Sequence, residues 1–186
     1  MINILLAGVG GQGTVLAAKV LAQAAQSKGW HVRTAETIGM AQRGGAVTTV
    51  VRVGERVGSM VADLGRADVI VSFETTEALR NLPQLAEGGM LIVNDEAIKP
   101  LPVLTGAAKM PADARGRLAA AGALLVPAEG MARACGNAKC ANVVLVGALS
   151  AALDIPEAVW RRAIEARVPA ATVEANLAAF AAGRAF

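Results

Sequence analysis

The chain has 186 residues, of which 54% are hydrophobic and 18% are charged, and its formal net charge is +3. This length predicts a single domain, residues 1–186, whose core is large enough to be stable without a disulfide or a metal. The mild charge, the dispersed arginines and the scarcity of aromatic rings, with three Phe, two Trp and no Tyr, argue against a nucleic-acid-binding surface.

Neither a membrane span nor a leader peptide is expected. The sequence begins directly with a strand pattern. Its longest apolar run, residues 143–149, is too short to cross a bilayer and predicts a helix buried on all sides. The two cysteines, Cys135 and Cys140, fit neither a zinc-knuckle spacing nor a disulfide framework. The predicted location is therefore a reducing cytoplasm.

The first third of the chain predicts a β-α-β unit followed by a hairpin. Residues 2–8 predict a buried strand, residues 14–27 an amphipathic helix, and residues 30–36 a second strand with Glu36 at its carboxyl end. A loop is expected over residues 37–45. Residues 46–60 are rich in β-branched side chains and predict a hairpin that turns at Gly54 and Glu55.

Alternation of strands and helices resumes in the rest of the chain. Strands are predicted at 67–73, 88–95 and 122–128, with a short helix at 75–82 capped by Thr75. Three prolines disfavour regular structure over residues 96–111. Helices follow at 129–135, 139–153, 154–168 and 173–183, the third opened by Asp154 and Glu157 at capping-box spacing.

These elements predict an α/β fold of the Rossmann-like kind. It consists of a mostly parallel sheet flanked by helices, with a β-hairpin insertion after the second strand and a helical carboxyl-terminal region.

The run Gly-Val-Gly-Gly-Gln-Gly at residues 8–13 matches the G-x-G-x-x-G pattern of dinucleotide-binding loops. It follows a predicted strand and opens a predicted helix, and Glu36 comes 23 residues after its last glycine, where a carboxylate could accept from ribose hydroxyls. The pattern predicts a phosphate-bearing ligand at the helix start. The alternative is that the glycines only permit a sharp turn and close packing. The candidate ligand contacts in this loop are Gly8, Gly10, Gly11, Gln12, Gly13 and Thr14.

The pattern excludes a nucleotide-hydrolase phosphate loop. That loop needs a lysine after its last glycine, and Thr14 and Val15 follow Gly13 instead.

A second candidate segment is the loop at residues 37–45, which contains Gln42, Arg43 and Gly44. A guanidinium and an amide can bind an anionic ligand or a facing chain. The alternative is an arginine that is merely solvated. Loops that follow parallel strands line one crevice, so this loop and the glycine loop are expected to face each other. Asn142 is expected either to anchor the glycine loop by a hydrogen bond or to be an ordinary helix-terminus amide.

The chain is poor in acid–base chemistry. His31 is the only histidine, and its place in a predicted strand favours a structural role. No Ser-His or Cys-His constellation can be built from it. We therefore predict no catalytic residue and no metal-ligand set in this chain.

Three stretches, residues 8–22, 36–54 and 136–150, together make the chain resemble the gamma-type subunits of the 2-oxoacid:ferredoxin oxidoreductases. Within that family it is most similar to the small beta subunits of indolepyruvate ferredoxin oxidoreductases. The resemblance implies a heteromeric enzyme that oxidatively decarboxylates an arylpyruvate, forms the acyl-coenzyme A and reduces ferredoxin. Thiamine diphosphate and 4Fe–4S clusters would lie on a large partner subunit.

The resemblance further implies that this chain docks on the large subunit. It would offer the glycine loop, Gln42 and Arg43 to coenzyme A or to that partner. Two alternatives stay open: a stand-alone NAD(P)-binding oxidoreductase that uses Glu36, and a non-catalytic nucleotide-binding assembly module.

Overall fold

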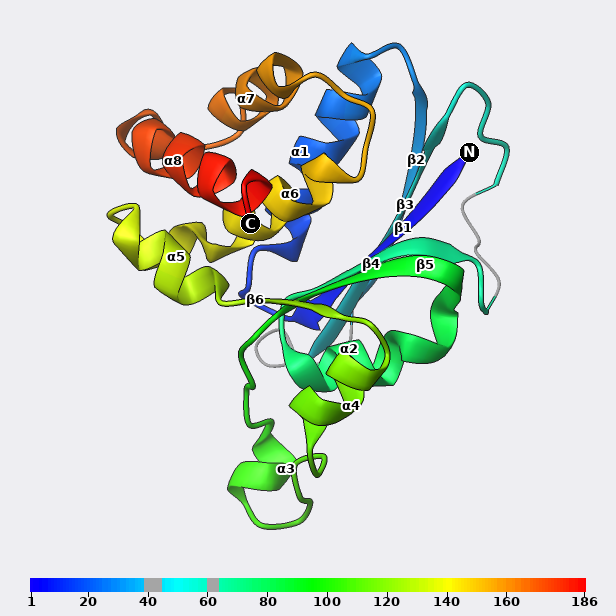
Figure 1. Ribbon diagram of the computed structural model, residues 1–186, viewed down its shortest axis with the longest axis vertical. Coiled ribbons are helices and arrows are strands. Elements are labelled where there is room, and N and C mark those ends of the chain that lie inside the picture. The colour runs from blue at the N-terminus through cyan, green and yellow to red at the C-terminus, as the bar shows by residue number, and fades with distance from the viewer. Residues whose placement is uncertain (39–44, 60–63) are drawn as a thin grey trace.

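A computed structural model describes residues 1–38, 45–59 and 64–186. At its centre is a six-stranded sheet in the order β2-β3-β1-β4-β5-β6, with helices on both faces (Figure 1). The strands are β1 (Ile2–Val9), β2 (His31–Ile38), β3 (Ala46–Gly54), β4 (Ala67–Ser72), β5 (Leu85–Asn94) and β6 (Leu124–Val126). The helices are α1 (Thr14–Ser27), α2 (Thr75–Asn81), α3 (Leu101–Leu104), α4 (Ala114–Ala120), α5 (Ala128–Ala134), α6 (Ala141–Ala151), α7 (Glu157–Glu165) and α8 (Val173–Arg184).

The helices form two unequal layers. Helices α1, α5, α6, α7 and α8 lie on one side of the sheet, α2 and α4 lie on the other, and α3 projects away from the body (Figure 1). Helix α6 is buried from Asn142 to Ser150, as expected from its unbroken apolar run. The rings of Trp160 and Phe180 are fully buried in the same layer, with their centroids 6.3 Å apart. The larger hydrophobic core therefore lies between the sheet and the five-helix layer.

The predicted α/β fold with a mostly parallel sheet is confirmed. Strand β4 runs parallel to both β1 and β5, and β5 runs parallel to β6. Strand β3, in contrast, is antiparallel to both β1 and β2. Strands β1 and β2 therefore point the same way, but β3 separates them, and the plain β-α-β unit expected from the sequence is interrupted.

The hairpin predicted within residues 46–60 is wrong. Residues 46–54 form the single strand β3, and its hairpin partner is β2 rather than the segment after Gly54. Strand β3 pairs with β1 along one edge and with β2 along the other, so neither edge of β3 is free to pair with residues 55–59. Alternate side chains of β3, at positions 47, 49, 51 and 53, are buried, which is the pattern of a strand with one face packed on the core.

Two predicted helix caps are also wrong. Helix α2 begins at Thr75, and the side chain of Glu74 caps it instead. Helix α7 follows Pro156 without a side-chain cap, while Asp154 pairs with Lys28 at 2.6 Å. In the proline-rich segment the short helix α3 forms after all, because prolines are tolerated in the first turn, where no intrahelical acceptor is needed.

Candidate ligand-binding crevice

The crevice arises where the sheet reverses its order of connection, between β1 and β4. From β1 the chain crosses through α1 to β2 on one side, whereas from β4 it crosses through α2 to β5 on the other. The loops after β1 and β4 diverge at the carboxyl ends of these strands, and in open α/β sheets ligands bind at this point. The glycine loop, residues 8–13, begins with the last two residues of β1.

Gly8, Gly11 and Gly13 of this loop each have a reason to lack a side chain. A Cβ on Gly8 would lie 2.9 Å from Cβ of Phe73, which is too close for real atoms. Gly11 and Gly13 have φ angles of +101° and +82°, a left-handed conformation that favours glycine. A Cβ on Gly13 would also lie 3.0 Å from Cγ of Asn142, but one on Gly11 would meet nothing within 4 Å. Gly11 is therefore the open position of the loop.

The side chain of Gln12 holds the loop in shape. Its Oε1 accepts from the backbone N–H of Val9 at 2.8 Å, and its Nε2 donates to the carbonyl of Phe73 at 2.9 Å. The N–H of Gly10 donates to the carbonyl of Gly45 at 2.9 Å. Because both ends of its amide are engaged, Gln12 positions the loop, and one N–H and one lone pair of this amide remain for a ligand.

The two helices that start at this edge differ in how they are capped. Glu74 accepts from the N–H of Thr76 at 3.0 Å and from the N–H of Glu77, so a carboxylate already occupies the start of α2. Helix α1 begins after Gly13 with no side-chain cap and no acidic residue in its first turn. Its first amides have no intrahelical acceptor and carry partial positive charge. The start of α1 therefore suits an anion.

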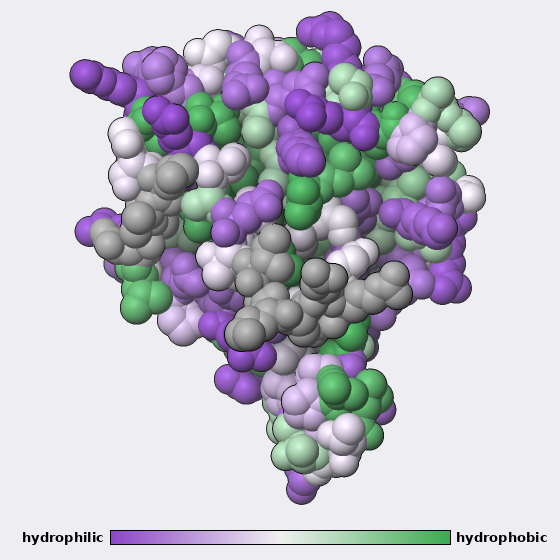
Figure 2. Space-filling model, turned by 180° about the vertical axis from the view of Figure 1, so that it is seen from behind, coloured by the Kyte–Doolittle hydropathy of each residue, from purple (hydrophilic) through white to green (hydrophobic). Residues whose placement is uncertain are grey.

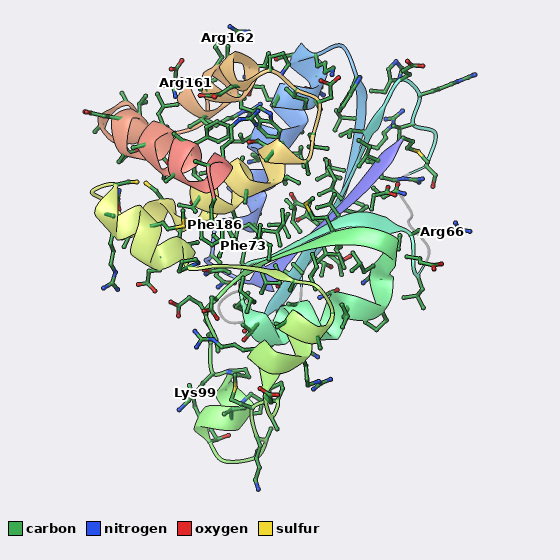
Figure 3. The ribbon with its side chains drawn as sticks, viewed as in Figure 1. Arg66, Phe73, Lys99, Arg161, Arg162 and Phe186 are labelled. Atoms are coloured by element: carbon green, nitrogen blue, oxygen red, sulfur yellow. The ribbon has the colours of Figure 1, made fainter. Side chains whose placement is uncertain are left out.

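A pocket of about 450 Å³ opens beside the glycine loop. Phe73, at the end of β4, lies near the centre of the molecule (Figure 3). Lys139, which precedes α6, brings a positive charge to the pocket, and Glu96 and Glu129 bring carboxylates. This volume lies in the range of small-molecule sites. The lining residues are Gly11, Gln12, Phe73, Asn94, Glu96, Ile98, Glu129, Ala138, Lys139, Ala141, Asn142 and Leu145.

Asn94 connects several segments that line the pocket through hydrogen bonds. It is 7% exposed, its Nδ2 donates to the carbonyl of Phe73 at 3.2 Å, and its Oδ1 accepts from the N–H of Ala128 at 3.2 Å. The Phe73 carbonyl thus receives hydrogen bonds from both Gln12 and Asn94. These bonds join the ends of β4 and β5, the glycine loop and the start of α5 into one framework.

The structure brings some of the predicted site residues together. Gly11, Gln12 and Asn142 line the pocket, while Gly8, Gly10, Gly13 and Thr14 belong to the same turn without lining the pocket. The Nδ2 of Asn142 lies 3.4 Å from the carbonyl oxygen of Gly13, so the expected hydrogen bond to the glycine loop is present. Gln42, Arg43 and Gly44 lie outside the described residues.

Glu36 is not part of the pocket. It is exposed on β2, the edge strand, and β3 lies between that strand and β1. In a dinucleotide-binding fold the acidic strand end lies next to the glycine loop, and neighbouring strands are about 4.8 Å apart. The inserted strand therefore doubles the separation that a ribose would have to span.

Sequence reasoning missed several pocket residues, above all Phe73, Asn94, Glu96 and Lys139. The signal that could have found the first three was their position, because each follows or ends a predicted parallel strand at the ligand-binding edge. Lys139 had no such signal. It comes from a segment far along the chain that packs beside the glycine loop only in the folded structure.

The described residues offer little chemistry of their own. Within these residues no group of three or more His, Cys, Asp or Glu side chains could hold a metal ion. Burial raises the pKa of the Cys140 thiol, with a smaller contribution from Cys135, which keeps the thiol protonated. His31 is exposed. No helix in the part of the chain that the structure describes is long and apolar enough to cross a membrane.

Comparison with known proteins yields a consistent set of relatives. Residues 3–186 match the family model described as pyruvate ferredoxin/flavodoxin oxidoreductase. The chain is 41% identical over 194 aligned positions to the indolepyruvate oxidoreductase subunit IorB of Thermococcus kodakarensis, covering 97% of this chain and 93% of that protein.

Solved structures agree with this. The gamma subunit of a keto/oxoacid ferredoxin oxidoreductase from Geobacter sulfurreducens superimposes with a TM-score of 0.73 at 25% identity, covering 98% of this chain and 96% of that subunit. The 2-oxoglutarate:ferredoxin oxidoreductase of Magnetococcus marinus, solved with 2-oxoglutarate, coenzyme A and succinyl-CoA bound, has a TM-score of 0.76 at 21% identity. It matches 99% of this chain but only 30% of its own. The same fold thus occurs both as a separate subunit and as one part of a longer chain.

Proposed function

Because the chain belongs to the pyruvate ferredoxin/flavodoxin oxidoreductase family and is a small subunit of a 2-oxoacid ferredoxin oxidoreductase, we propose that it acts in a complex specific for indolepyruvate or another arylpyruvate. The large subunit of this cytoplasmic complex carries thiamine diphosphate and iron–sulfur clusters, and ferredoxin accepts the electrons. This chain docks on the large subunit and binds part of coenzyme A in its crevice. Support for the substrate comes from the 41% identity to an indolepyruvate oxidoreductase subunit.

The division of labour is supported by what this chain contains. A 4Fe–4S cluster needs four cysteine ligands, and the whole sequence has two cysteines. Thiamine diphosphate, when bound to the large subunit, supplies the carbanion chemistry of decarboxylation. This chain contributes binding groups instead.

The observation that carries the coenzyme A proposal is the uncapped start of α1 beside Lys139. Gly11 and Gln12, which lead into this helix, line the pocket together with Lys139, and backbone amides near a lysine suit the phosphates of coenzyme A. Glu96 and Glu129 on the same rim would accept from ribose hydroxyls or from the adenine amino group. Since one acceptor oxygen of Glu129 already pairs with Arg133 at 2.5 Å, Glu96 is the freer of the two.

The stand-alone NAD(P)-dependent alternative has less support. It relied on Glu36 as the ribose carboxylate, and Glu36 lies on the far side of β3 from the glycine loop. A non-catalytic assembly module is the remaining alternative, and only activity measurements separate it from the proposal.

The test is to purify the complex from its native cells through a tag on this chain. We expect a brown complex that reduces a dye when given indolepyruvate, coenzyme A and thiamine diphosphate. A colourless chain that arrives alone and binds NAD(H) would contradict the proposal.

The role of the crevice is tested separately, with Lys139→Met in the purified complex. The apparent KM for coenzyme A should rise about tenfold with little change in kcat, because the variant loses one charge-assisted contact. Lys19→Met, at an exposed position of α1 outside the pocket lining, is the matched control. Equal KM values for coenzyme A in all three proteins would show that coenzyme A does not bind in this crevice.

A further inference from the structure

Between β5 and α4 the chain forms an arm, residues 97–112, that stands away from the body. Figure 1 shows α3 at its tip, below the rest of the molecule, and Figure 2 shows hydrophobic side chains on the same protrusion seen from behind. Leu101 is 71% exposed and Leu104 is 66% exposed, and Ile98 at the root is 41% exposed. Neither hydrophobic cluster of the described residues includes a side chain from the arm.

The arm holds its shape by its own hydrogen bonds. The N–H of Thr105 donates to the carbonyl of Leu101 at 3.0 Å, and the N–H of Ala108 donates to the carbonyl of Pro102 at 2.9 Å. Pro100 and Pro102 restrict the backbone on either side of Leu101. An arm that is ordered before binding loses less conformational entropy when a partner covers it.

The charged side chains of the arm are all positive. Lys99 and Lys109 flank the exposed leucines, and residues 97–112 contain no acidic side chain. Lys99 lies beside α3 (Figure 3). A partner surface complementary to this arm is therefore an apolar pocket with an acidic rim.

The root of the arm joins the candidate crevice. Ile98 lines the 450 Å³ pocket together with Glu96, the residue just before the arm. A partner that covers the arm therefore also lies next to the open side of the crevice.

From these observations we propose that residues 97–112 are the docking arm for the large subunit of the same oxidoreductase, which receives Leu101 and Leu104 in an apolar pocket rimmed by carboxylates. This inference rests on the proposed function. Exposed leucines on a subunit of a larger enzyme mark a surface that the assembly covers. In the 2-oxoglutarate:ferredoxin oxidoreductase of Magnetococcus marinus the matching fold is 30% of one longer chain, so the same fold occurs there covalently joined to the rest of such an enzyme, and this favours the large subunit as the occupant.

The test measures binding of this full chain to the isolated large subunit, whose identity is established by mass spectrometry and bound thiamine diphosphate. The double variant Leu101→Asp/Leu104→Asp should weaken binding by more than about tenfold, since buried apolar anchors carry much of an interface's affinity. The control is Leu64→Asp, which alters a leucine that is 76% exposed outside the arm. It should bind like the wild type, and circular dichroism should show that all three chains are folded.

A second variant tests the charge. Lys99→Glu/Lys109→Glu should lower the association rate at low salt, and the difference from wild type should shrink as salt is added.

The outcomes separate the two proposals. A wild-type chain that binds no thiamine-dependent large subunit refutes the proposed function and this inference together. If the wild type binds but the leucine variant binds equally well, only the arm is refuted. A wild-type chain that forms a dimer, which the leucine variant splits without any loss of large-subunit binding, would assign the arm to self-association and overturn the proposal.

Discussion

Replacing Gly147 by alanine should destabilise the protein, although the same change in an open helix stabilises it. Gly147 lies within α6, where α8 crosses closely, and both helices contribute to the larger core. A Cβ at this position would lie 2.8 Å from the backbone nitrogen of Arg184, 3.0 Å from the carbonyl carbon of Gly183 and closer still to the carbonyl oxygen of Phe180. Ordinary contacts begin near 3.4 Å, so the Arg184 contact alone would require α8 to move by about 0.6 Å, and the closer contact with Phe180 requires more.

The size of the effect follows from two opposing terms. Removing a glycine from a helix interior gains about 1 kcal/mol. Overpacking a well-filled core costs about 1–3 kcal/mol, and here the upper value applies because the methyl group meets backbone rather than a side chain that can turn away. The net loss is about 2 kcal/mol in the free energy of unfolding, which lowers the Tm of a chain of this length by about 4–8 °C.

The assay is urea unfolding followed by circular dichroism, with Gly130→Ala as the matched control. Gly130 lies within α5, and a Cβ there would meet nothing within 4 Å, so this variant should gain up to about 1 kcal/mol. If Gly147→Ala were as stable as Gly130→Ala, the close crossing of α6 and α8 would not constrain the fold and the reasoning would be refuted.

Three further predictions follow from the crevice and its surroundings. Burial raises the pKa of the Glu77 carboxyl, against the opposing effect of Arg80, so the folded state binds its proton more tightly and wild-type stability falls as pH rises above 4.5. Glu77→Gln should therefore have a higher free energy of unfolding than wild type at pH 7. Urea unfolding should show that this difference in stability vanishes near pH 4. Gly13→Ala should unfold at a lower urea concentration and bind coenzyme A more weakly than Gly11→Ala. Both glycines have a left-handed backbone, but only a Cβ at position 13 also clashes with Asn142. Equal affinities of the two variants for coenzyme A in calorimetry would contradict this prediction. Asn94→Ala should cost about 1–3 kcal/mol in urea unfolding, since it leaves the buried N–H of Ala128 without its acceptor and removes one of the two donors to the Phe73 carbonyl; a loss below about 0.5 kcal/mol would show that water replaces the amide.

The local elements of this protein were predictable because their signals are local. The apolar run of β1, the glycine turn and the amphipathic α1 lie next to one another in sequence, and each is recognisable from periodicity or backbone requirements alone. The unbroken apolar run of α6 likewise predicted a helix buried on all sides. The glycine loop was thereby placed correctly at the carboxyl end of a parallel strand.

Strand order was not predictable in the same way, and it determines where Glu36 lies relative to the glycine loop. Residues 46–54 have the pattern of a strand wherever they pair, but whether they fold back on residues 55–59 or insert between β1 and β2 depends on which edges are free and which face is buried. The insertion moved Glu36 to the outer edge of the sheet and removed it from the crevice.

The sequence by itself determined the α/β class, the glycine loop and its helix, and the family to which the chain belongs. Tertiary structure alone decided that Phe73, Asn94 and Lys139 meet that loop, and that residues 97–112 stand outside the core. The physical reason is that periodicity and turn chemistry act over a few residues, whereas a pocket is made by residues far apart in the chain whose approach depends on how the whole sheet and both helix layers pack.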